Sequence, residues 1–222
     1  GVGGVPYTVA KMLAESDKKD LGCHTGTISD AFLELYKAGK LTNARKELDT
    51  GRSAWNLAMG SQALYDWLDA EPDIFHPGDL DYIHSVERIS KLSNVISING
   101  GVQLDLMGQE NAESAGTRQL SGIGGQMDFL EGAYRSKGGK GFICINSSRV
   151  TKDGERKSNI VAAIPSGSTI SAPRTMIQYV ATEYGIADLA GKSLRERAEA
   201  MAAIAHPDFR EELLKYARET FQ

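Results

Sequence analysis

The chain has 222 residues, of which 41% are hydrophobic and 24% are charged, a composition that is ordinary for a globular protein. Its formal net charge of −4 offers no basic field for nucleic acid, and no apolar run is long enough to span a bilayer. Cys23 and Cys144 lie far apart in short apolar segments, which favours buried reduced thiols and a cytoplasmic location.

The chain opens inside a glycine cluster that contains Gly1, Gly3 and Gly4, and it does not begin with Met. A glycine turn of this kind normally follows a strand, and no strand precedes it in this sequence. We therefore expect residues 1–222 to form one domain, the C-terminal part of a longer polypeptide that is cut inside a glycine loop.

Strand and helix patterns then alternate along the chain. The expected strands are residues 21–24, 54–59, 95–99, 102–106, 141–146, 160–164 and 179–182. The expected helices are residues 7–14, 28–38, 62–68, 127–135, 193–203 and 209–220. Gly39 is expected to end the second of them, and Ser193 with Glu196 forms a capping box. Residues 25–27 and 75–78 are expected to be a turn and a loop, and Gly100-Gly101 a hairpin or a bulge. The alternation predicts an α/β fold with a mostly parallel sheet flanked by helices.

The most informative stretch is residues 121–129, which read Ser-Gly-Ile-Gly-Gly-Gln-Met-Asp-Phe. Gly122, Gly124 and Gly125 fall within four positions, directly before an amphipathic helical pattern. Glycine permits positive φ and a close approach between backbone and ligand. Free N–H groups at a helix start attract a phosphate, a carboxylate or a thioester oxyanion. The same pattern is also typical of a plain tight turn, so both interpretations remain open.

Six stretches in one order carry a resemblance to a known family. They are residues 21–25, 116–118, 121–129, 182–185, 191–197 and 205–210. Together they resemble the C-terminal half of the acetyl-CoA hydrolase/transferase family, with most similarity to 4-hydroxybutyrate and butyryl-CoA:acetate CoA-transferases. The resemblance implies a class I CoA-transferase (NagB/RpiA-like) fold and a homo-oligomer that needs an N-terminal domain or partner subunit. It also implies acyl-CoA and a short carboxylic acid as substrates, with no permanently bound cofactor.

The resemblance also gives the glycines and one asparagine their expected roles. Gly1, Gly3 and Gly4 match a loop that contacts CoA, and residues 122–126, including Gln126, match the loop that closes over the thioester and pantetheine. Asn99 matches an asparagine near the thioester carbonyl, where its amide would stabilise the oxyanion. Its structural alternative is a turn former before the glycine pair.

The sequence departs from the family at Gly26. Members use a glutamate nucleophile directly after the His-Thr or His-Ser pair, and Gly26 stands at that position here. Asp30 is the next carboxylate and is expected to point elsewhere, while Cys23 and His24 would face opposite sides of a strand. Three functions therefore remain open: a CoA-transferase with an unexpected nucleophile, an acyl-CoA hydrolase that uses water, and a CoA-binding subunit without chemistry.

Other polar side chains have two interpretations each. Glu183 contacts either substrate or a neighbouring loop, and Arg118 pairs either with a substrate anion or with an acidic residue. Asp105 and Glu110 flank a turn and are expected to be solvated, as is the charged run at 152–157. His206 marks a helix boundary. The four histidines show no metal-ligand spacing, so no metal is expected.

Overall fold

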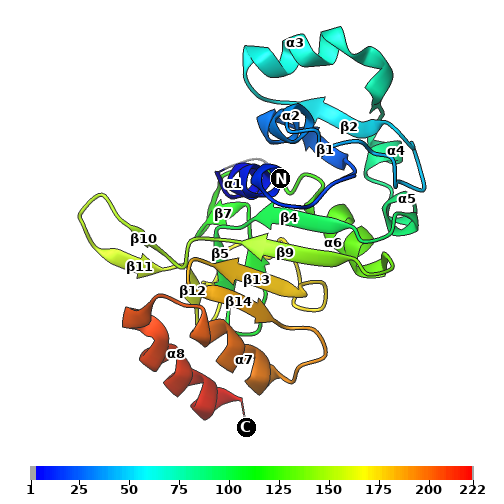
Figure 1. The fold of residues 1–222 in the computed structure, drawn as a ribbon. Coiled ribbons are helices and arrows are strands. Elements are labelled where there is room, and N and C mark those ends of the chain that lie inside the picture. The colour runs from blue at the N-terminus through cyan, green and yellow to red at the C-terminus, as the bar shows by residue number, and fades with distance from the viewer. Residues whose placement is uncertain (1–3, 222) are drawn as a thin grey trace. The chain divides into compact units, whose positions relative to one another are not determined.

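The computed structural model describes residues 4–221, which divide into two compact units (Figure 1). Unit 1 comprises the chain up to Ser97 together with Glu131–Lys140, and unit 2 comprises Ile98–Leu130 and the chain from Gly141 onward. Each unit has its own hydrophobic core and is described by itself. No helix within residues 4–221 is both long and apolar enough to cross a membrane.

Unit 1 is built on a three-stranded parallel sheet in the order β1-β2-β3. Its strands are β1 (His24–Ile28), β2 (Ser53–Ala58) and β3 (Phe75–Pro77), and its helices are α1 (Gly4–Glu15), α2 (Asp30–Lys37), α3 (Gln62–Ala70), α4 (Leu80–Ile83) and α5 (Val86–Lys91), with a 3-10 turn at Pro72–Ile74. The core lies between the sheet and its helices, where Trp67 packs edge-on against Phe75 with ring centroids 4.8 Å apart.

Most of the largest sheet belongs to unit 2, and its strand order is β14-β13-β9-β4. Its strands are β4 (Ile96–Gly100), β9 (Lys140–Cys144), β13 (Tyr179–Thr182) and β14 (Gly185–Asp188). β13 runs parallel to β9 and antiparallel to β14. A smaller sheet joins β12 (Ile160–Val161), β5 (Gln103–Asp105) and β6 (Glu110–Asn111), with β12 parallel to β5.

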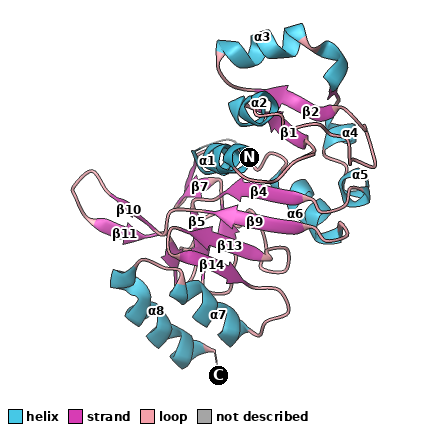
Figure 2. Ribbon diagram, in the orientation of Figure 1, coloured by secondary structure: helices cyan, strands magenta, loops and turns pink. Residues whose placement is uncertain are grey.

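Two hairpins and three helices complete the regular structure that unit 2 carries in whole or in part. The hairpins are β7 (Ser114–Ala115) with β8 (Arg118–Gln119), and β10 (Ser148–Val150) with β11 (Arg156–Ser158). The helices are α6 (Gln126–Arg135), which ends in unit 1, α7 (Leu194–Ala203) and α8 (Pro207–Thr220). Figure 2 shows the β10–β11 hairpin as an arm that projects from unit 2, and α7 packs against both β14 and α8.

Local signals in the sequence correctly locate several element ends. Ser193 accepts a hydrogen bond from the backbone N–H of Glu196, and the Glu196 carboxylate accepts one in return, so the predicted capping box is confirmed. Gly39 has φ +68 and follows α2 as the predicted glycine stop. The predicted strand at 179–182 coincides with β13, and the predicted α/β class is correct.

Other predictions are wrong. Residues 25–27 are not a turn but the middle of β1, because the two β-branched threonines lie in a strand paired with β2. Residues 75–77 form β3 at the sheet edge, where Pro77 is tolerated. Of the two arrangements expected at Gly100-Gly101, the hairpin is wrong, since β4 and β5 belong to different sheets, and the bulge stays a prediction. The charged run at 152–157 is exposed throughout, as expected, but its last two residues, Arg156 and Lys157, lie in β11 and not in a loop.

Candidate functional site

The glycine loop, residues 121–125, is exposed along most of its length and leads directly into α6. Gly124 has φ +59, a left-handed conformation that side chains disfavour. Apart from adjoining residues, no atom of residues 4–221 lies within 4 Å of a Cβ built at Gly122 or Gly124. Crowding inside the described chain therefore does not explain these glycines. Backbone conformation explains Gly124, whereas the space around Gly122 does not require a glycine there.

The first end of the glycine loop is fastened to the buried residue Glu113. The backbone N–H groups of Leu120 and Ser121 donate to the Glu113 carbonyl oxygen at 2.6 and 3.2 Å. The Gln119 amide donates to Glu113 Oε1 at 3.3 Å, and the Ser171 hydroxyl donates to Glu113 Oε2 at 2.7 Å. Backbone and side chain of one residue thus hold the start of the loop.

The second end is fastened to Glu110, which was expected to be solvated and is instead fully buried. Gln126 Nε2 donates to Glu110 Oε1 and Oε2 at 2.8 and 2.7 Å. Asp105 is also fully buried, with its carboxylate accepting bonds from the Met107 and Gln109 backbone N–H groups and the Gln109 amide. Sequence reasoning missed both burials, because a Glu and an Asp beside a short turn give no signal of the packing around them.

Asn99 and Arg118 lie in unit 2 as well. Asn99 is half-buried one residue before the end of β4, so its predicted place near a strand end is correct. Arg118 is exposed on β8. The roles predicted for both in substrate binding stay predictions.

Glu183 has the structural contacts of its second interpretation. Ser147 donates to its carboxylate through the hydroxyl at 2.6 Å and through the backbone N–H at 2.9 Å. Partial burial opposes ionisation, but these two hydrogen bonds outweigh it and hold the pKa of Glu183 below its usual value. His206 serves as the N-cap of α8 and accepts a bond from the Asp208 backbone N–H, which confirms its place at a helix boundary.

Gly26 lies inside β1 in unit 1, in extended backbone, and carries no functional group. Burial raises the pKa of the neighbouring Cys23 thiol to about 12, so it stays protonated at neutral pH. His24 donates from Nε2 to the Ile83 carbonyl oxygen at 2.8 Å, and burial lowers its pKa. Asp30 binds the Ser61 hydroxyl at 2.7 Å and the Ser61 backbone N–H. Each of these neighbours therefore has a structural role.

The remaining predicted residues lie near the chain start. Gly1 and Gly3 lie outside the described residues. Gly4 is not in a loop but opens α1, with Thr8 donating to its carbonyl oxygen at 2.9 Å. No group of three or more His, Cys, Asp or Glu side chains within residues 4–221 is arranged to hold a metal ion.

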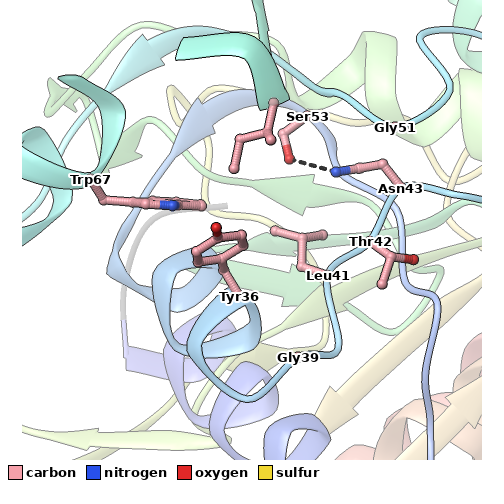
Figure 3. A pocket seen from close by; sticks show the side chains of 9 residues that line it. Tyr36, Gly39, Leu41, Thr42, Asn43, Gly51, Ser53 and Trp67 are labelled. Atoms are coloured by element: carbon pink, nitrogen blue, oxygen red, sulfur yellow. Dashed lines mark hydrogen bonds between the residues drawn. The ribbon is translucent and has the colours of Figure 1, made fainter. Parts of the chain in front are cut away.

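Unit 1 also contains a cavity of about 270 Å³, shown in Figure 3. Tyr36, Leu41 and Trp67 line it together with Asn43, whose amide donates to the Ser53 hydroxyl at 3.0 Å. None of the predicted site residues within 4–221 lines this cavity, so it is separate from the site that the resemblance implies.

Comparison with known structures defines the class of the fold. Residues 4–221 fold like the C-terminal part of a 4-hydroxybutyrate CoA-transferase from Porphyromonas gingivalis, with a TM-score of 0.83 and 37% identity over 100% of this chain and 50% of that one. RipA from Yersinia pestis is similar with a TM-score of 0.89 and 40% identity, covering 99% of this chain and 48% of RipA. The fold is therefore that of a CoA-transferase C-terminal domain.

The sequence comparison gives the family. Residues 60–217 match the Acetyl-CoA hydrolase/transferase C-terminal domain. The butyryl-CoA:acetate CoA-transferase of Anaerostipes caccae is 46% identical over 217 residues, which are 98% of this chain and 48% of the relative. The chain belongs to the acetyl-CoA hydrolase/transferase family and spans about half the length of the curated relatives it matches.

Proposed function

We propose that this chain is the acyl-CoA-binding half of a CoA-transferase that moves CoA between short-chain carboxylic acids, such as butyrate or 4-hydroxybutyrate and acetate. The glycine loop carries the proposal, because Gly122 and Gly124 face open space at the start of α6. The names of the relatives supply the substrate class. A further domain or a partner subunit, corresponding to the half of the relatives that this chain does not span, would supply the rest of the acid pocket, and a homo-oligomer in the cytoplasm is part of the proposal.

The proposed chemistry needs hydrogen-bond donors where charge develops on the thioester oxygen. The Asn99 amide and the backbone N–H groups of the glycine loop are proposed as those donors. The positive end of the α6 dipole adds to the same field. CoA acts as a substrate in this scheme and leaves with each turnover.

Gly26 favours a second candidate function, which is hydrolysis of acyl-CoA. A transferase of this family needs a carboxylate to accept the acyl group and then CoA, and Gly26 provides none. Water attacking a thioester held by the glycine loop would need no nucleophile from β1. If water does not attack the bound thioester either, the chain would be a CoA-binding subunit without turnover.

Product analysis separates the three functions. The chain, alone and mixed with the N-terminal half of the Anaerostipes caccae relative, is incubated with butyryl-CoA, with and without acetate. Acetyl-CoA that appears only with acetate supports transfer. Free CoA without acetyl-CoA supports hydrolysis, and saturable binding without either product supports a binding subunit. Absence of butyryl-CoA binding in both preparations contradicts the proposal.

A further inference from the structure

Glu110 is a buried carboxyl group that the proposed chemistry does not use. It is fully buried at the start of β6, and the Gln126 amide contacts both of its oxygens, at 2.8 and 2.7 Å. Gln126 is the first residue of α6 and directly follows the last glycine of the loop. The carboxyl group is therefore one side chain away from the loop backbone.

The backbone around Glu110 is fixed as well. Its N–H donates to the Ala172 carbonyl oxygen at 3.0 Å, and its carbonyl oxygen accepts from the Ser171 N–H at 2.8 Å. On the other side lies Gly101, where a Cβ would come within 2.6 Å of Glu110 Oε1 and 3.1 Å of Ile145 Cγ2. A side chain at position 101 would collide with the carboxyl group, so Gly101 leaves the room that Glu110 fills.

We propose that Glu110 is a positioning residue that, acting through Gln126, holds the helix end of the glycine loop in the arrangement that receives acyl-CoA. The inference rests on the proposed function, since acyl-CoA binding is what makes the position of the loop matter. Glu113 holds the opposite end of the loop through hydrogen bonds, so both ends are held by acidic residues of the segment 110–113. Glu110 is a positioning residue, not a catalytic one, because its oxygens are buried and occupied by Gln126.

The stability of the closed loop, which Glu110 holds through Gln126, depends on pH. Burial raises its pKa to about 8, the Gln126 amide pulls the pKa down, and the charge of Glu113 raises it again. Glu113 is the titratable group whose charge acts on Glu110. Gly101, Ser171 and Ala172, which lie next to Glu110 on other segments, do not titrate. The buried state therefore keeps the proton, whereas an opened loop would release it to water. Opening of the loop becomes easier as the pH rises from about 4.5 to about 8, and the change levels off above that.

Hydrogen–deuterium exchange of the intact 222-residue chain tests this inference on peptides that cover residues 116–130. Exchange is measured at pH 6 and pH 8, corrected for intrinsic chemistry, with and without butyryl-CoA. In the unaltered chain, the opening constant of the loop should rise at least tenfold between these pH values. Glu110→Gln, which mimics the protonated carboxyl, should abolish the rise.

Two further variants and one control complete the experiment. Glu110→Ala and Gln126→Ala each remove the contact and should open the loop at both pH values, and each should weaken butyryl-CoA binding about tenfold or more. Asp105→Asn is the control. Asp105 is another buried carboxylate, and it accepts a hydrogen bond from the Gln109 amide at 2.7 Å, but it does not hold the loop. If Glu110→Ala fails to fold, Gln126→Ala still removes the same contact from the helix side.

The outcomes distinguish the inference from the proposed function. The inference is overturned if Gln126→Ala changes neither loop exchange nor butyryl-CoA affinity, and if Glu110→Gln shows the same pH response as the unaltered chain. These results would leave the proposed function standing. If butyryl-CoA protects no loop amide in the unaltered chain, either alone or mixed with the N-terminal half of the relative, the proposed function fails. In that case a tenfold pH response that Glu110→Gln removes still supports Glu110 as the loop anchor. If loop exchange responds equally to pH in every variant, the proposal that Glu110 anchors the loop is overturned as well.

Discussion

The glycine loop in unit 2 and strand β1 in unit 1 both match active-site segments of the family by resemblance, but they are built differently. Most of the loop is exposed, its ends are held by Glu110 and Glu113, and Gly122 and Gly124 face open space. Strand β1 is an ordinary parallel strand in which the position expected for the nucleophile is Gly26. The comparison teaches that the loop can be anchored at both ends while the strand position that the resemblance assigns to the nucleophile carries no side chain.

Gly26→Glu tests the β1 side of this comparison and should have the largest effect. In the chain joined to a relative's N-terminal half, we expect CoA transfer from butyryl-CoA to acetate to rise about 100-fold, roughly 2.7 kcal/mol of barrier. Gly26 lies in extended backbone, so glutamate adds no left-handed strain, and its side chain would share a face of β1 with His24. Gly26→Gln is the control without a nucleophile. Equal rates for Glu and Gln would show that the rest of the site does not suit this chemistry.

Glu110→Gln tests the loop side through protein stability. The pKa of Glu110 is raised in the folded chain to about 8 from an ordinary value of 4.5. Its contribution to the free energy of unfolding is therefore fully present below pH 4.5 and is lost as the pH rises to about 8. Relative to the unaltered chain, the Gln variant should gain on the order of 4 kcal/mol between pH 5 and pH 9 in urea unfolding. A pH-independent difference would show that Glu110 ionises freely.

Gly122→Val tests whether the loop glycines serve a ligand. Because a Cβ at Gly122 meets no atom of residues 4–221 beyond its neighbours, we expect the melting temperature to change by less than about 2 °C. The Kd for butyryl-CoA should nevertheless rise about tenfold, roughly 1.4 kcal/mol, since the side chain fills the space left for the thioester. Gly124→Val should also weaken binding, but its φ of +59 adds about 1–2 kcal/mol of strain. Normal binding in Gly122→Val would support a plain structural turn.

Asp30→Ala should have the smallest effect and sharpens the account of β1. Asp30 accepts hydrogen bonds from the Ser61 hydroxyl and backbone N–H, next to the start of α3. Removing them should cost about 1 kcal/mol of unfolding free energy in urea titrations. Butyryl-CoA turnover by the chain joined to the N-terminal half should not change. A large loss of turnover would instead identify Asp30 as the carboxylate that replaces the family glutamate.

The sequence predicts those features that depend on nearby residues. The capping box of Ser193 and Glu196, the glycine stop after α2 and the helix after the glycine loop follow from local hydrogen bonds and backbone preferences. The turn predicted at residues 25–27 was wrong because pairing with β2 overrides the turn preference of a glycine. Burial of Glu110 depends on Gly101 and Gln126, which lie on other elements, and a single sequence does not show that these residues meet.

Our central claim is that this chain has the acyl-CoA loop but supplies no carboxylate nucleophile, since Gly26 stands at the β1 position expected for it. Mass spectrometry tests it most directly, after butyryl-CoA is added to the chain joined to the N-terminal half and the mixture is treated with hydroxylamine or borohydride. We predict no modified carboxylate in the unaltered protein and one modified residue, at position 26, in Gly26→Glu. A hydroxamate or a reduced side chain at any native Asp or Glu of the unaltered chain would contradict the claim, because it would identify a nucleophile outside β1.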